Sequence, residues 1–149
     1  KTLKRFIRMI SNNDMNFVSG MSAFEAKEFA RAIQFLVPFA EKGDPDAQHR
    51  VAIMYQNGLG MVKKPDEAFT WMKIAAEQGH AVAQHGLGFM NMDGDCTEKN
   101  PQKAIEWFTK AADQGLVGSL TTLAMMYDEG NGVPQDKEKA QELYTKAGF

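Results

Sequence analysis

The sequence predicts an all-α solenoid of stacked helix pairs, and two observations support this fold class. The first is a repeat of 36 residues along the 149-residue chain, in which large, small and turn residues all recur at the same positions. The second is a helical spacing of the apolar residues inside each repeat. The aligned columns are Ala32, Ala68, Ala104 and Ala140; Phe35, Trp71, Trp107 and Leu143; and Gly43, Gly79 and Gly115.

Each repeat is expected to be an antiparallel helix pair. Runs that start at Pro65 and Pro101 place apolar residues at i, i+3, i+4 and i+7, the spacing of an amphipathic helix. Proline is tolerated in the first turn of a helix, and Gly79 and Gly115 stand where a chain leaves a helix in the left-handed conformation. Small residues recur where two helices would cross closely: Ala52, Gly88 and Ala124.

Four hairpins are expected, at about 15–42, 46–79, 82–115 and 118–148, within a single solenoid over residues 15–149. The first hairpin is shorter than the others, because 12 residues separate Gly20 from Ala32 where 16 separate Gly88 from Ala104. It is therefore expected to lack a loop extension of four residues and to begin the solenoid.

The last helix is expected to close the stack. Gln141 and Tyr144 stand where the preceding repeat has Ile105 and Phe108, so this helix has a more polar outer face. Terminal repeats of a solenoid commonly carry such a polar face, because no further repeat covers them.

Residues 1–14 form a separate basic segment with an amphipathic pattern. Four basic residues lie opposite four apolar ones: Lys1, Lys4, Arg5 and Arg8 against Leu3, Phe6, Ile7 and Ile10. Residues 1–10 contain no acidic residue, which leaves 13 basic and 19 acidic residues in the rest of the chain. Docking of this segment on the body is the favoured interpretation, and docking on another copy, contact of residues 1–10 with anionic lipid, or fraying stay open.

Two runs closely resemble a known repeat family. These are PDEAFTWMKIAAEQGHAVAQHGLGFMNMDG from Pro65 and PQKAIEWFTKAADQGLVGSLTTLAMMYDEGNGV from Pro101. Their Ala, Trp, Lys-Ala-Ala, Gly, Ala-Gln, Leu-Gly, Tyr and Gly-x-Gly-Val pattern resembles the Sel-1-like repeat (SLR), a relative of the tetratricopeptide repeat (TPR). The resemblance extends from about Phe17 to the end and implies an α/α right-handed superhelical solenoid, with a bacterial source favoured.

The middle repeat departs from the family pattern at two places. Asn91 replaces the tyrosine found at Tyr55 and Tyr127. Asp95, Cys96 and Thr97 replace the Gly-x-Gly loop ending of the other repeats. These changes leave the loop geometry of the middle repeat open without altering the predicted fold.

Composition and charge exclude several classes of protein. The chain is 44% hydrophobic and 24% charged, which suits a folded domain. Its net charge of −2 lacks the basic excess typical of nucleic-acid binding. The single cysteine, Cys96, excludes an intrachain disulfide and a CxxC site.

No apolar run approaches the ~20 residues of a membrane span. A cytoplasmic location is favoured, and a periplasmic or secreted one stays open if a leader was removed.

The sequence predicts no catalytic, metal or cofactor site. It contains no GxSxG, SxxK, HExxH or Walker motif, so we expect no enzyme. The loop from Gly58 to Lys64 is interpreted as an inter-helix turn rather than a phosphate loop. The acidic turn at 93–98 lacks the glutamate that a calcium loop needs. His49 and His85 share one repeat position and are expected to approach each other, but no third metal ligand accompanies them.

A binding face is expected on the concave side of the solenoid. In the related TPR fold the first helix of each hairpin lines that side, and its positions carry over to twelve residues: His49, Ile53, Gln56, Asn57, His85, Phe89, Met92, Asp93, Thr121, Met125, Asp128 and Glu129. Phe17, Met21 and Phe24 would extend the face. Flexible methionines with acidic neighbours suit the recognition of peptides or helices. The alternative is that Ile53, Phe89 and Met125 pack between helices as core.

The resemblance implies a non-enzymatic scaffold or adaptor that binds a protein or peptide partner. One alternative, by family analogy, is a weak β-lactam-binding hydrolase, although the relatives with that activity carry cysteine pairs in each repeat and this chain has only Cys96. A second alternative is a self-associating structural module, in which the last hairpin or the basic segment forms a homo-oligomer.

Overall fold

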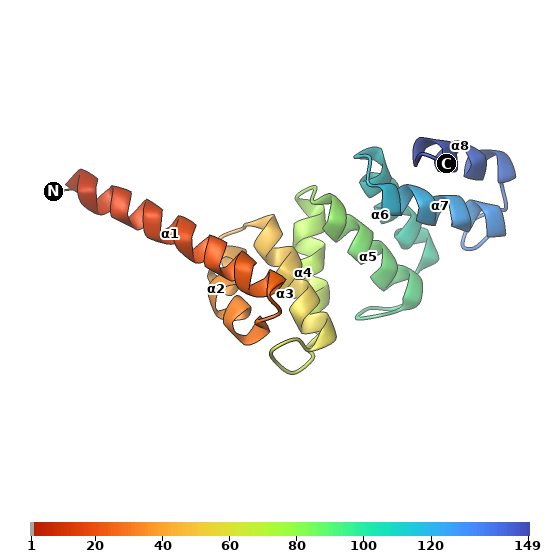
Figure 1. Ribbon diagram of the computed structural model, residues 1–149. Coiled ribbons are helices and arrows are strands. Elements are labelled where there is room, and N and C mark those ends of the chain that lie inside the picture. Colours follow the sequence, from red (N-terminus) through yellow and green to blue (C-terminus); the bar gives the residue numbers. More distant parts are fainter. Residues whose placement is uncertain (1) are drawn as a thin grey trace.

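The computed structural model describes the backbone of residues 2–149 and the side chains of residues 2–5 and 14–149. This part of the chain contains helices and no strands, which confirms the predicted all-α class. Figure 1 shows the helices stacked as successive pairs from one end of the molecule to the other. They are α1 (Thr2–Glu25), α2 (Phe29–Glu41), α3 (Pro45–Asn57), α4 (Pro65–Glu77), α5 (Ala81–Asp93), α6 (Pro101–Asp113), α7 (Val117–Glu129) and α8 (Lys137–Lys146).

The pairs stack into an elongated solenoid of two layers. Each helix packs mainly against the helices before and after it in the chain. Helices α1, α3, α5 and α7 form one layer, and α2, α4, α6 and α8 form the other (Figure 1). No helix in the part that the structure describes is long and apolar enough to cross a membrane.

Helix α1 is longer than the other helices, and its N-terminal part projects beyond the first hairpin (Figure 1). The helix passes through the expected boundary between residues 14 and 15 without a break. Lys1 and the side chains of residues 6–13 lie outside the described residues. The amphipathic pattern expected for residues 1–14 therefore stays a prediction.

The loops inside the hairpins confirm that the first hairpin is shorter. Three residues, 26–28, connect α1 to α2, whereas seven residues connect the helices of each later hairpin. Each long loop begins with a left-handed glycine and has a second left-handed residue two positions on: Gly60 with φ 74°, Cys96 with φ 65° and Gly132 with φ 74°. The middle loop therefore keeps the geometry of the others, although Cys96 replaces the glycine.

These loops close over the hairpin that precedes them. A Cβ atom added at Gly60 would lie 2.6 Å from the backbone nitrogen of Ala30, at the start of α2. A Cβ atom added at Gly132 would lie 2.8 Å from Cβ of Pro101, at the start of α6. Glycine is required at these positions because a larger residue would push the loop away from the preceding hairpin.

Small residues allow the helices of a hairpin to cross closely, as the sequence predicts. A Cβ atom added at Gly88 would lie 2.6 Å from the ring of Phe108, and one at Gly20 would lie 2.8 Å from the side chain of Leu36. The equivalent Ala52 and Ala124 are fully buried. In the described residues the core consists of three clusters along the solenoid, made mainly of buried alanine, leucine and methionine side chains.

A buried glutamine joins each of the first two hairpin junctions. Gln48 donates a hydrogen bond to the carbonyl of Ala40 at 3.0 Å, and Gln84 donates one to the carbonyl of Ala76 at 3.1 Å. Their side-chain oxygens accept from the end of their own hairpin, where Gln78 donates to Gln48 at 2.6 Å and Gln114 donates to Gln84 at 2.9 Å. Leu120 stands at this position in α7, so the last junction lacks the bonds of this glutamine ladder.

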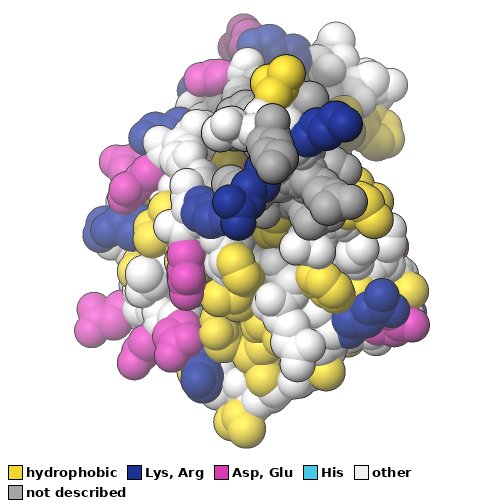
Figure 2. Space-filling view, turned by 90° about the vertical axis from the view of Figure 1, so that its left-hand side faces the viewer, with side chains coloured by type: hydrophobic (Ala, Val, Ile, Leu, Met, Phe, Trp, Pro, Cys, Tyr) yellow, Lys and Arg dark blue, Asp and Glu magenta, His cyan; other side chains and the backbone are white. Residues whose placement is uncertain are grey.

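The N-terminal end of the molecule exposes apolar surface. Figure 2 shows this end, where hydrophobic side chains gather on the lower half of the face and charged side chains lie mainly along its left side. Met15 and Val18 of α1 are 63% and 61% exposed. The first hairpin therefore leaves part of its apolar surface uncovered.

Candidate functional site

The predicted binding residues all lie on α3, α5 and α7, and we call them the candidate face. None of the twelve is buried. Asn57, Asp93, Met125 and Glu129 are exposed, and the others are half-buried. Because the three helices belong to one layer and the residues recur at intervals of 36, equivalent side chains stand on successive helices.

An apolar row runs along the candidate face, with one residue from each helix. Ile53 packs against the core between α3, α4 and α5, and Phe89 packs against the core between α6 and α7. The ring of Phe89 meets that of Phe108 edge to face, with 5.0 Å between centroids. Met125 is 51% exposed and belongs to none of the core clusters. The row is therefore partly core at Ile53 and Phe89 and open at Met125.

His85 connects α5 to the next hairpin. Its Nδ1 atom lies 2.7 Å from the hydroxyl of Ser119 on α7. Its ring lies edge to face on Phe89 at 4.9 Å and is tilted against Phe108 at 5.4 Å. Burial lowers the pKa of His85, so the ring is neutral at pH 7 and serves as packing material for the face.

His49 stacks on His80, a residue that the sequence does not single out. The two rings lie 5.0 Å apart at an angle of 28°. Nδ1 of His80 accepts from the backbone N–H of Ala83 and so caps α5, which places the proton of the neutral ring on Nε2. That Nε2–H donates to Asp46 at 2.9 Å. Asp44 caps α3 from the same repeat position, and this match is the signal that could have identified His80.

The electrostatic environment keeps His49 neutral at pH 7. Burial is the main cause that lowers the pKa of His49 to about 4, and the electrostatic effects of His80 and Arg50 act in the same direction. Asp46 opposes them. His49 thus stacks on His80 and His85 bonds to Ser119, each at the junction with the next hairpin, and no ring contact between His49 and His85 was found in the described chain. In the same part of the chain, no three His, Cys, Asp or Glu residues could hold a metal ion.

Polar groups at the C-terminal ends of the helices border the face. Gln56 donates to Asp95 of the following hairpin at 2.9 Å, and Asn57 donates to the carbonyl of Ile53. Asp128 pairs with Lys137 at 3.0 Å. Thr121 of α7 uses its hydroxyl to donate to backbone carbonyls of its own helix. Asp93 and Glu129 are exposed and give this border solvent-accessible negative charge.

The side chains on α1 that were expected to extend the face point largely into the first hairpin. Phe17, Met21 and Phe24 are half-buried and pack against the core of α2 and α3. The ring of Phe17 meets that of Phe39 at 5.2 Å, and the ring of Phe24 meets that of Phe29 at 5.6 Å. These aromatic rings stabilise the hairpin and offer only part of their surface to a partner.

A family model and two solved structures match the repeats of this chain. The Sel1 repeat model matches residues 45–80, 81–116 and 120–148. A Sel1 repeat protein from Oxalobacter formigenes has a crystal structure that is 32% identical, with a TM-score of 0.80 over 86% of this chain. A protective antigen present in uropathogenic Escherichia coli strains, which displays an SLR fold, is 30% identical, with a TM-score of 0.85 over 93% of this chain.

The chain spans only part of these relatives, 52% of the Oxalobacter protein and 31% of the Escherichia coli antigen. No curated protein matches the sequence at a significant level. Three consecutive repeat matches cover more than half of the chain, and each coincides with a helix pair of the solenoid. The chain therefore belongs to the Sel1 repeat family, whose members are typically non-catalytic scaffolds that mediate interactions between proteins.

Proposed function

We propose that this solenoid is a non-enzymatic scaffold whose concave side, the candidate face, binds a peptide or helical segment of a partner protein. The observation that carries the proposal is the row of Ile53, Phe89 and Met125, which offers one partly open apolar side chain from each of three successive helices. Met125 is the most open of the three and leaves the row with an uncovered apolar end.

The spacing between the members of the row sets the spacing of apolar residues that a bound segment needs. Packed helices lie about 10 Å apart, so successive members of the row are separated by a similar distance. About three residues of an extended strand or seven residues of a helix span that length. Asp93 and Glu129 border the row with exposed negative charge. A segment with apolar residues at one of these spacings and with basic neighbours fits both the shape and the charge.

The experiment selects peptides from a random display library on the wild-type chain and measures their affinity for two variants. Met125→Glu places a charge in the row, whereas Ile74→Glu places one on α4, in the other layer, at a residue that is 38% exposed. Because burial of a methionine contributes about 1.5–3 kcal/mol, we expect Met125→Glu to weaken binding by about tenfold or more. Ile74→Glu should leave the affinity unchanged.

Two further measurements decide the result. Circular dichroism establishes that both variants fold, and the methyl signals of Met92 and Met125 should shift when a selected peptide is added. Peptides that bind both variants equally, without moving these methyl signals, would place the binding surface elsewhere. Turnover of nitrocefin by the wild-type chain would contradict the non-enzymatic role.

A further inference from the structure

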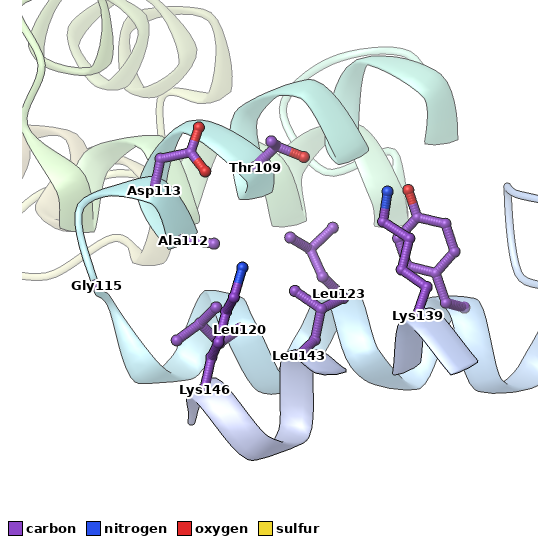
Figure 3. Close-up of a pocket in the computed structure, with 10 residues that line it drawn as sticks. Thr109, Ala112, Asp113, Gly115, Leu120, Leu123, Lys139, Leu143 and Lys146 are labelled. Atoms are coloured by element: carbon purple, nitrogen blue, oxygen red, sulfur yellow. The ribbon is translucent and has the colours of Figure 1, made fainter. Parts of the chain in front are cut away.

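A pocket of about 480 Å³ opens between α6, α7 and α8, away from the candidate face. Leu120, Leu123 and Leu143 form its apolar floor (Figure 3). Polar side chains stand around the opening, where Asp113 and Thr109 of α6 face Lys139 and Lys146 of α8. The pocket shares no residue with the candidate face and is not explained by the proposed function.

The preceding hairpin has an equivalent, smaller pocket, and there an indole forms part of the lining. The equivalent space between α4, α5 and α6 measures about 240 Å³ and is lined by Trp107. One repeat later, Leu143 occupies the position of Trp107. Leu123 and Leu87 also correspond, as do Lys139 and Lys103. The larger volume of the last pocket accompanies the replacement of tryptophan by the smaller leucine.

The charges around the last pocket also repeat those of the filled one. Lys110 holds its ammonium group 4.6 Å from the centre of the Trp107 ring. Lys146 stands at the same repeat position, where no ring is present for it to cover. Figure 3 shows the Lys146 ammonium group directed over the pocket, and the Lys139 ammonium group lies 4.8 Å from the ring of Tyr127. In the described chain, neither lysine forms an ion pair.

We propose that this pocket binds an aromatic side chain of a partner polypeptide, with acidic residues next to that aromatic residue. The aromatic ring would occupy the space that Trp107 fills in the preceding hairpin, on the leucine floor and under the Lys146 ammonium group. Carboxylates on either side of it would meet Lys139 and Lys146, and among the residues that line the pocket Asp113 is the one acidic group. The pocket thus selects acidic aromatic segments, the opposite charge preference to that of the candidate face.

Three short peptides test the chemistry of the pocket by NMR titration of the isotope-labelled full chain. They are acetyl-Asp-Trp-Asp-amide, acetyl-Lys-Trp-Lys-amide and acetyl-Asp-Ala-Asp-amide. We expect the first to shift the signals of Leu120, Leu123 and Tyr127. The basic peptide should bind about tenfold more weakly, because two exposed charge contacts change sign at up to about 1 kcal/mol each. The alanine peptide should cause no shift at these residues.

Two kinds of variant separate the pocket from other surfaces. Leu143→Trp restores the residue of the preceding repeats and should abolish binding, and Leu143→Phe serves the same purpose if the indole prevents folding. The double variant Lys139→Glu with Lys146→Glu should prefer the basic peptide. Lys103→Glu, at the position of Lys139 one hairpin earlier, should leave the preference of the last pocket unchanged.

The proposal is overturned if the acidic tryptophan peptide shifts signals outside the pocket only, or if its binding survives in the folded Leu143→Trp variant. It is also overturned if Leu143→Trp converts an oligomer of the chain into a monomer in solution without changing the affinity for the peptide. In that case a second copy of the chain covers the pocket of the wild type. None of these outcomes depends on whether the candidate face binds its own partner.

Discussion

His80 performs three tasks with one imidazole ring. Its Nδ1 atom caps α5, its Nε2–H binds Asp46, and its face stacks on His49. Asp46 also lies 3.8 Å from Arg50, so one carboxylate serves two cationic or polar partners at the junction between hairpins. The cap uses the lone pair of Nδ1 of His80, which accepts from the backbone N–H of Ala83.

We predict that this junction makes the protein less stable in weak acid. The pKa of His49 is about 4 in the folded chain, against the ordinary value of 6.5 in the unfolded chain. Between these two pH values the unfolded chain therefore binds a proton that the folded chain does not. Stability therefore falls as the pH drops from about 6.5 towards 4, and the loss stops below that value. The difference in pKa corresponds to about 2–3 kcal/mol at pH 4.5.

The measurement compares urea unfolding of the wild type and of His49→Gln at pH 7 and pH 4.5. Both chains carry Asp46 and all other acidic groups, so their effects cancel in the difference between the two. The stability advantage of the wild type over His49→Gln should shrink by that amount at the lower pH. An advantage that stays constant with pH would show that His49 titrates normally.

At the scale of elements, the glutamine ladder fixes how neighbouring hairpins meet. Gln48 and Gln84 are almost completely buried, yet each has its amide group satisfied by backbone and side-chain partners from two hairpins. A buried amide without partners costs more than the bonds themselves contribute. The ladder therefore favours one relative placement of the hairpins over others that would leave the amide unpaired.

We predict that Gln114→Ala lowers the free energy of unfolding by about 1–3 kcal/mol, because it leaves the side-chain oxygen of Gln84 without its donor. The bond from Gln114 to the carbonyl of Gly79 is lost as well. Gln102→Ala is the matched control, since Gln102 is exposed on α6, the helix that Gln114 directly follows. Equal effects of the two substitutions in urea unfolding would contradict the role assigned to the ladder.

At the scale of the molecule, the two ends of the solenoid differ in how firmly they are attached. The N-terminal hairpin is joined to α3 through Gln48, whereas Leu120 gives the last hairpin no such bond. The open pocket between α6, α7 and α8 removes further contacts at the same end. In a repeat protein, the stability of each hairpin depends mainly on such contacts with its neighbours.

We predict that amide hydrogen exchange is fastest, among the hairpin helices, in α7 and α8. Local opening of a weakly attached terminal unit exposes its amides without global unfolding. Helix α2, in the other terminal hairpin, is the internal control and should exchange more slowly. Leu143→Trp should slow exchange in α7 and α8 by filling the pocket, and equal protection of both ends would refute the prediction.

The sequence predicts the repeat and the close crossings correctly because these depend on residues that recur inside each unit. Gly88 against Phe108 is an example, since both belong to one hairpin. It does not reveal the stack of His49 on His80, because that contact joins residues of different hairpins and depends on their relative placement. For the same reason, periodicity places Ile53 and Met125 at one repeat position but does not predict that only Met125 is exposed.

The loops that close over the preceding hairpin are made later than the helix starts that they cover. Gly60 reaches the start of α2 and Gly132 reaches the start of α6, so a segment about 30 residues further along the chain completes the cover of each helix start. At translation speeds of about 5–20 residues per second, that segment leaves the ribosome on the order of seconds later. The nascent chain therefore leaves the starts of α2 and α6 incompletely covered for that interval, in which a chaperone could bind them.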